Sequence, residues 1–233
     1  MMIKPVTRLQ ICAAIRMHRH LGQWRLSDSA LHSLREKMPG WNDEESLVKC
    51  VAINALYGTN VFAIVRMAMH VRSILEPLQG CYLDGLVGQI SLLDLNDGKR
   101  PRQHVSFASK LCHFFVNEEH YPIYDNAARD ALRYHLGNDY CGDRSEPYKA
   151  FQENLRRLRA ASSIVTATGR EMDRYLWIVG MYMRYEEWRR AGAKGRPIVN
   201  TELFQVFEQR PIPDDLDTLL PRGLTRFLGA NHL

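Results

Sequence analysis

Apolar residues recur at three- and four-residue intervals along most of this chain, and this periodicity limits the folds open to it. Between residues 61 and 75, the apolar positions along one helical face are Val61, Ile64, Val65, Ala68, Val71 and Leu75. Such spacing is typical of amphipathic α-helices, whereas apolar and polar residues alternate along half-buried strands. The few β-branched clusters are too short, and too poorly bounded by turn signals, to indicate a sheet. The pattern therefore predicts an all-α protein.

Breaker residues and caps define the expected helices. These cover about 6–21, 27–38, 43–57, 61–75, 105–116, 124–136, 146–161, 170–190 and 200–208, with a short segment at 82–95. Ser27 or Asp28 is the expected N-cap of the second helix, which ends at Pro39-Gly40. A polar turn at 96–102 carries three cationic side chains and marks the midpoint of the molecule. We expect one compact helical unit over 1–233, with lobes at about 1–97 and 98–233.

Composition narrows the class of partner and the cellular setting. A chain of 233 residues with 45% hydrophobic content can bury a sizeable core. Lys and Arg outnumber Asp and Glu by 31 to 26, and a pI of about 9.0 favours a polyanionic partner. The five cysteines are scattered without a C-x-x-C pair, as expected of reduced thiols. Without a signal peptide or a long apolar run, we expect a soluble, cytoplasmic protein that does not enter a membrane.

The stretch from residue 106 to residue 129 carries the most specific signal. Ser106-Phe107-Ala108 opens a helix with small residues, and Lys110 lies in its first turns. An extended segment, Tyr121-Pro122-Ile123, then delivers Asp125 to the start of the next helix. This arrangement resembles the signature of helix-hairpin-helix DNA glycosylases, in which a Gly-hydrophobic-Gly hairpin is followed by Lys, a hydrophobic helix and a Pro-Val-Asp-type segment. Ser and Ala replace both hairpin glycines here.

Two other fragments fit the same resemblance. They are Asn54-Ala55-Leu56-Tyr57-Gly58-Thr59-Asn60 and Asp173-Arg174-Tyr175-Leu176-Trp177. Together with the central stretch they are similar to a divergent branch of the glycosylase family, for which defence against phages with hypermodified DNA is the functional setting. The resemblance implies two packed helical lobes with a cleft between them. It also implies a monomer that binds DNA and needs no metal or organic cofactor.

The implied activity is excision of a modified base, such as glucosylated hydroxymethylcytosine or an oxidised base, which leaves an abasic site. Cleavage of an N-glycosidic bond passes through an oxocarbenium-like sugar, which a carboxylate near C1′ stabilises. The resemblance assigns that role to Asp125. It assigns to Lys110 a nucleophilic amine that forms a Schiff base after the base departs, which would add AP-lyase activity.

Phosphate and base contacts complete the expected site. The candidates for DNA binding are Lys99, Arg100, Arg102, Ser106 and Ser109, in the polar turn and the first turns of the helix that follows. The candidates for a pocket around a flipped base are Phe107, Phe114, Tyr57, Tyr124 and Trp177.

Simpler roles compete with these functional ones. Lys110 is also consistent with a surface lysine, and Asp125 with an N-cap of the 126–136 helix, a role that can coexist with catalysis. The protein would then be a non-catalytic DNA-binding module of the same fold. A third alternative is a metal-dependent nuclease, although the spacing of His113, Glu118, Glu119 and His120 matches no common ligand pattern. The basic runs at 156–159 and 184–190 predict either a DNA groove or solvated helix faces with i,i+4 partners.

Overall fold

The computed structural model describes residues 3–78, 83–94, 102–164, 166–192, 195, 197–221 and 224. Helices contain most of these residues, and a single two-stranded ladder is the only sheet among them. The prediction of an all-α protein is therefore confirmed at the level of secondary structure. The helix expected at 43–57 has those bounds, and the one expected at 105–116 ends one residue earlier.

The chain divides into two compact units. Unit 1 comprises Met1–Arg25, Asp125–Gly142 and Ala150–Leu233, and unit 2 comprises Leu26–Tyr124 and Asp143–Lys149. These boundaries fall at other places than the division expected at 97/98, and residues 95–101 around that point lie outside the described residues. Helices α2 (Gly22–Lys37) and α8 (Pro147–Ser162) each run from one unit into the other.

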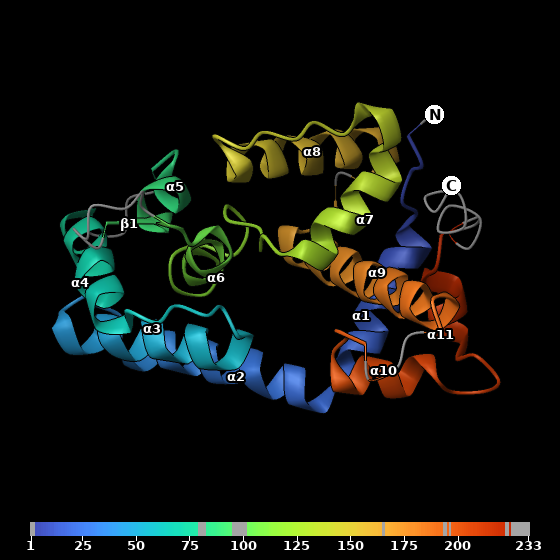
Figure 1. The fold of residues 1–233 in the computed structure, drawn as a ribbon, viewed down its shortest axis with the longest axis horizontal. Coiled ribbons are helices and arrows are strands. Elements are labelled where there is room, and N and C mark those ends of the chain that lie inside the picture. The colour runs from blue at the N-terminus through green and yellow to red at the C-terminus, as the bar shows by residue number, and fades with distance from the viewer. Residues whose placement is uncertain are drawn as a thin grey trace. The chain divides into compact units, whose positions relative to one another are not determined.

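In the described part of unit 2, several helices pack together besides its share of α2 and α8 (Figure 1). Its elements are α3 (Asp43–Tyr57), α4 (Ile64–Leu75), the 3-10 turn η1 (Glu76–Leu78), α5 (Leu86–Ser91), β1 (Leu92–Leu93), β2 (Arg102–Gln103) and α6 (Val105–Phe115). Helix α3 packs against α4 and α6, and α5 packs against α6. Their shared core includes Ile53, Met67, Ile90 and Leu111, none of which has exposed surface.

Unit 1 is organised around its longest helix. Its elements are α1 (Arg8–His20), α7 (Asn126–Leu136), the 3-10 turn η2 (Gly137–Asp139), α9 (Gly169–Arg190), α10 (Thr201–Phe207) and α11 (Asp214–Leu219). Helix α9 packs against α1, α7 and α10, and α1 packs against α11 (Figure 1). Thr7 and Thr168 begin α1 and α9 with reciprocal capping boxes, in which Gln10 and Glu171 bond back to the cap amide.

The start of α2 differs from the prediction. The expected caps, Ser27 and Asp28, both lie inside the helix, which begins at Gly22. The Glu202 carboxylate of α10 accepts hydrogen bonds from the Gln23 and Trp24 amides, at 3.0 and 3.2 Å. A carboxylate from a distant part of the chain thus satisfies the first amides of the helix, so no local cap is needed.

The β1–β2 ladder was not indicated by the sequence pattern and corrects the expectation that the chain contains no sheet. The strands are antiparallel, with Leu92 opposite Gln103 and Leu93 opposite Arg102. Two residues per strand are too few for an alternating pattern to appear in the sequence. The ladder places β2 directly before α6, the helix that carries Lys110.

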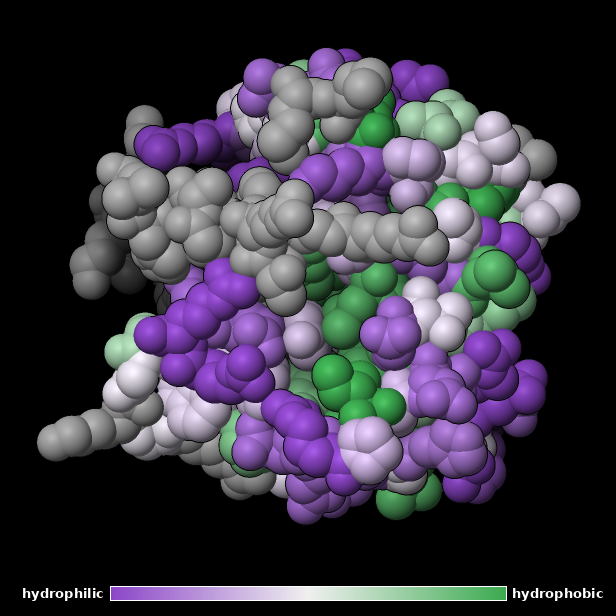
Figure 2. Space-filling view, turned by 90° about the vertical axis from the view of Figure 1, so that its right-hand side faces the viewer, coloured by the Kyte–Doolittle hydropathy of each residue, from purple (hydrophilic) through white to green (hydrophobic). Residues whose placement is uncertain are grey.

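The surface of the described residues mixes polar and apolar side chains. On the face drawn in Figure 2, hydrophobic residues lie between hydrophilic ones. Several charged residues of unit 1 form ion pairs, such as Arg8 with Glu171 at 3.0 Å and Arg16 with Asp215 at 2.7 Å. No helix within the described ranges is both long enough and apolar enough to cross a membrane.

Candidate active site

Helix α6 and the segment after it form the centre of the candidate site. All residues of α6 except Ser106 are buried, including the polar Ser109, Lys110 and His113. Residues 121–124, which we call the strap, follow in a backbone conformation that is neither helix nor strand. The strap ends at Asp125, directly before α7. The order of lysine helix, proline-containing strap and aspartate is the order that the sequence predicted.

Lys110 is a buried residue with three oxygen acceptors in unit 2. Its side chain is 4% exposed, so it is not the surface lysine of the simpler alternative. Its Nζ donates to Ser106 Oγ at 2.7 Å and lies 3.4 Å from the Ser106 carbonyl oxygen. A longer contact of 3.5 Å joins Nζ to the carbonyl oxygen of Tyr124, the last residue of the strap. Lys110 therefore binds the peptide group that leads into Asp125.

Ser109 fixes the same peptide from its other side. Its Oγ accepts a hydrogen bond from the Tyr124 amide at 3.0 Å and donates to the Ser106 carbonyl at 3.1 Å. Ser109 has no exposed surface. In this conformation its hydroxyl therefore binds the strap rather than a phosphate. Ser106 is partly exposed, and its hydroxyl is closer to Lys110 Nζ than either of the two carbonyl oxygens named above.

Asp125 caps α7 in unit 1. Its Oδ1 accepts a hydrogen bond from the Ala128 amide at 2.7 Å, which confirms the N-cap interpretation. Within the described residues, Oδ2 has no hydrogen-bond partner. One carboxylate oxygen therefore holds the helix, while the other is available for a ligand.

A close helix–helix approach holds the start of α7 in unit 1. Gly180 in the middle of α9 lies so near Ala127 that a Cβ at this position would overlap the Ala127 carbonyl group. Only glycine permits this approach. The first turn of α7, and with it the Asp125 cap, is thereby seated on α9.

Lys110 lies in unit 2 and Asp125 in unit 1, and Lys110 contacts the residue that is covalently bonded to Asp125. Tyr124, whose carbonyl oxygen Lys110 contacts, is the last strap residue of unit 2, and Asp125 is the first residue of the next segment of unit 1. The side chains of α6 thus act on the residue bonded to Asp125.

The residues aligned with the hairpin of the family do not form a hairpin. Ser106, Phe107 and Ala108 lie in the first turn of α6, which begins at Val105. Its N-cap, His104, makes no side-chain capping bond, and its amide donates to the Ser91 carbonyl at 2.8 Å. Without glycines, these residues adopt regular helical geometry, so the backbone turn that the glycine pair would allow is missing.

The fragment at 54–60 lies beside Lys110 in unit 2. It contains the turn between α3 and α4, in which Gly58 and Asn60 both have positive φ, 55° and 57°. The Asn54 side chain organises this turn through the Thr59 hydroxyl and both backbone groups of Val61. The structure therefore brings two of the three resembling fragments together, because the Tyr57 ring lies 5.8 Å from Lys110 Nζ.

The proposed pocket aromatics are only partly gathered. Tyr57 lies 5.5 Å from Phe114 between ring centroids, and its hydroxyl donates to the buried Asp28 at 2.7 Å. Phe107 and Phe114 are fully buried, whereas Tyr57 and Tyr124 are partly exposed. These four residues share unit 2. Trp177 belongs to unit 1, where its ring contacts Trp24.

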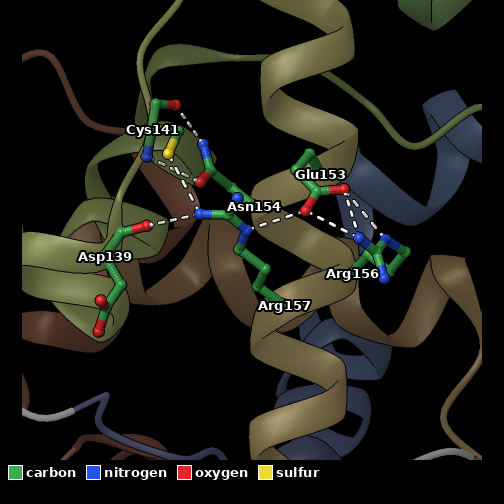
Figure 3. A network of polar contacts seen from close by, with 6 residues as sticks. All are labelled: Asp139, Cys141, Glu153, Asn154, Arg156 and Arg157. Atoms are coloured by element: carbon green, nitrogen blue, oxygen red, sulfur yellow. Dashed lines mark hydrogen bonds and ion pairs between the residues drawn. The ribbon is translucent and has the colours of Figure 1, made fainter.

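The predicted phosphate-binding cations fall largely outside the described residues. Lys99 and Arg100 lie outside the described residues, and only the backbone of Arg102, in β2, is described. The basic run at 156–159 is largely engaged with the protein itself (Figure 3). Arg156 and Arg157 both bind Glu153, at 2.7 and 2.9 Å, and Arg157 also donates to Cys141 Sγ at 3.1 Å.

The run at 184–190 is likewise paired with carboxylates. Arg184 binds Asp130 at 3.0 Å, and Arg189 and Arg190 each lie 3.8 Å from the buried Glu186. These contacts favour solvated, paired helix faces for both runs.

Two residues that hold the strap were not predicted in that role from the sequence. His113 Nδ1 donates to the Tyr121 carbonyl at 2.9 Å, and the Tyr148 hydroxyl of α8 donates to the Pro122 carbonyl at 3.0 Å. A histidine between Cys112 and Phe114, in a helix of mostly apolar residues, was a signal in the sequence for the first. Tyr148 carried none, because it lies 26 residues from its acceptor.

The residues considered for a nuclease do not form a cluster. His113 is used by the strap, and no three His, Cys, Asp or Glu side chains of the described segments are grouped as a metal site. Among the described cysteines, Cys50 and Cys112 are buried thiols, whereas Cys141 is exposed. Burial raises the pKa of Cys50 to about 12 and that of Cys112 further, so both remain protonated at neutral pH.

Part of this chain matches the model of a known protein family. Residues 10–120 match the model of the HI_0787_N family, described as an N-terminal domain. The match includes Lys110 and ends before Asp125.

A Haemophilus influenzae (strain Rd) protein, described as an uncharacterized protein, is 28% identical over 133 residues, which are 54% of this chain and 62% of the relative. The chain thus spans about three fifths of that relative's length. No solved structure matches the chain.

Proposed function

We propose that this protein is a DNA glycosylase, which flips a modified base out of DNA and cleaves its N-glycosidic bond with Asp125. The observation that carries the proposal is the grip of α6 on the Tyr124 peptide, through Ser109 and Lys110, directly before Asp125. These contacts support the proposal because they act on the residue directly before the carboxylate that would take part in catalysis. We further propose the two-lobed fold of the helix-hairpin-helix DNA glycosylases, with DNA bound in a cleft. In this proposal the protein acts as a monomer in the cytoplasm.

The geometry of Asp125 suits this chemistry. Its Oδ1 is held by the Ala128 amide, which fixes the orientation of the carboxylate. Its Oδ2 can then face the sugar, where a negative charge stabilises the oxocarbenium-like transition state or orients the attacking water. The bond between C1′ and the base nitrogen breaks, water adds to C1′, and an abasic site and the free base are left. No cofactor takes part in these steps.

Lys110 supports the site before it reacts. For a lyase step, its amine would condense with the aldehyde form of the abasic sugar, releasing water and forming a Schiff base. Nζ must first leave Ser106 and Tyr124, the groups that it binds here. The geometry therefore favours hydrolysis through Asp125 as the main reaction.

The competing function is a non-catalytic DNA-binding module. The observation in its favour is that both central residues already have structural roles, since Asp125 caps α7 and Lys110 is buried against α6 and the strap. The net charge of +5 suits DNA in either case.

The test uses two substitutions that separate the cap from the charge. Asn is as good an N-cap as Asp, so Asp125→Asn keeps the bond to Ala128 while removing the carboxylate. Asp125→Ala removes both and is expected to cost about 1 kcal/mol of stability as well. Asp139→Asn, at an exposed carboxylate of the same unit, is the matched control.

The assay incubates each protein, with chelator, on DNA containing glucosylated hydroxymethylcytosine or 8-oxoguanine. Abasic sites are then detected with and without alkali. We expect wild type and Asp139→Asn to release base and Asp125→Asn to release none while remaining folded. Strand breaks without alkali that vanish in Lys110→Gln would add the lyase step. Tight DNA binding without base release from either DNA would instead support the non-catalytic module.

A further inference from the structure

The strap has an unusual source of hydrogen bonds for its backbone. Residues 121–124 belong to no helix or strand, yet buried backbone groups need partners. Side chains supply them: His113 binds the Tyr121 carbonyl, Tyr148 the Pro122 carbonyl, Ser109 the Tyr124 amide and Lys110 the Tyr124 carbonyl.

These side chains come from two elements of unit 2. Three lie on α6, and Tyr148 lies in the first turn of α8. His113 and Ser109 have no exposed surface, and Tyr148 is 7% exposed. Pro122 adds rigidity because its ring fixes φ and it has no amide to satisfy. The strap is therefore held at both ends and in the middle.

We infer that Tyr148 and His113 are positioning residues, which set the strap so that Asp125 reaches the reacting sugar. This inference rests on the proposed glycosylase function. Neither side chain touches Asp125 in the contacts described above. Each acts through the backbone, whose direction at Tyr124 decides where the next residue begins. Misplacement of a catalytic group by about 1 Å can cost roughly 100-fold in rate.

Tyr148→Phe is the sharpest test because it removes one hydroxyl and keeps the ring. The matched control is Tyr182→Phe, since Tyr182 is similarly buried, at 8% exposed, and its hydroxyl also makes one hydrogen bond, to Glu186 at 3.1 Å. Tyr182 lies in α9, away from the strap in sequence and in unit 1. Both variants thus lose one buried hydroxyl.

Two readouts distinguish positioning from stability. The first is the single-turnover rate of base release, which we expect to fall about tenfold or more in Tyr148→Phe at unchanged DNA affinity, and to stay near wild type in Tyr182→Phe. The second is hydrogen exchange of the Tyr124 amide, which we expect to speed up only in Tyr148→Phe. A wild-type rate and wild-type exchange in Tyr148→Phe would overturn the inference.

His113 gives an independent check by conservative rescue. Asn can place an amide donor near the position of Nδ1, so His113→Asn should retain more activity and slower exchange than His113→Leu. Equal losses in both variants would show that His113 only fills space. If the wild type releases no base, the proposed function fails, but the exchange of the Tyr124 amide still decides whether Tyr148 and His113 hold the strap.

Discussion

Stability should fall on mild acidification because His135 is buried in its neutral form. This α7 residue has no exposed surface. Its Nδ1 lies 2.7 Å from the Lys4 carbonyl oxygen, to which it donates, and its Nε2 lies 3.1 Å from the Tyr175 hydroxyl, from which it accepts. The neutral ring therefore satisfies both partners. Burial lowers the pKa of His135 to about 4, and the ammonium group of Lys4 contributes in the same direction.

The sign and size of the effect follow from proton linkage. An unfolded histidine has a pKa of about 6.5, so between about pH 6.5 and 4 the unfolded chain binds a proton that the folded chain does not. The free energy of unfolding contributed by His135 is complete above this window and is lost as the pH falls through it. With a folded pKa of about 4, the loss is about 2 kcal/mol at pH 5 and about 3 kcal/mol at pH 4.

The assay is denaturant unfolding at several pH values, compared with that of His135→Asn. Asn cannot be protonated in this range but can still donate to the Lys4 carbonyl. We expect the variant to be less stable than wild type at pH 8 and to lose less stability between pH 7 and 4. His20→Asn, at an exposed histidine of α1, should follow the wild-type profile. Parallel pH profiles for wild type and His135→Asn would refute the reasoning.

Two further predictions concern a close packing contact and a second buried titratable side chain. Gly180→Ala should destabilise the protein by about 1–3 kcal/mol, because the new Cβ would overlap the Ala127 backbone. The control is Gly88→Ala in α5, where a Cβ meets nothing within 4 Å; this variant should be neutral or stabilising in thermal unfolding. Equal melting temperatures for Gly180→Ala and Gly88→Ala would contradict the close approach of α9 to Ala127. Burial lowers the pKa of Lys49 to about 8. Between about pH 8 and 10.5 the unfolded chain keeps a proton that the folded chain has lost, so the free energy of unfolding of wild type should rise with pH in this range. In denaturant unfolding, Lys49→Met should lack this rise, and the control Lys37→Met, at an exposed lysine, should retain it.

The helices could be predicted because their signals are local. Capping boxes at Thr7, Asn42 and Thr168 and the glycine that ends α3 act within a few residues of the helix that they define. The start of α2 could not be predicted, because the side chain that caps it, Glu202, is about 180 residues away in the sequence. The two-residue strands were not predicted either, because pairing between them depends on the path of the intervening chain.

Around the candidate site, the order of the segments was predictable from local signals. Lys110 and Asp125 stand out by their place in a short motif, and the α6–strap–α7 order follows from proline and helix signals. The pocket was not predictable, because whether an aromatic lines a cavity or fills a core depends on distant packing. Phe114 and Tyr57 show this, since they contact each other but only Tyr57 is partly exposed.

The polar residues of α6 link these arguments. A helix that is buried on nearly all sides would be most stable with apolar residues, because each buried polar group costs free energy unless it is hydrogen-bonded. Helix α6 nevertheless buries Ser109, Lys110 and His113, and all three bind the backbone of one four-residue strap. The strap has no ladder of its own, so its buried backbone groups depend on these side chains for hydrogen-bond partners. Under the proposed function, the same hydrogen bonds also set the backbone that leads into Asp125.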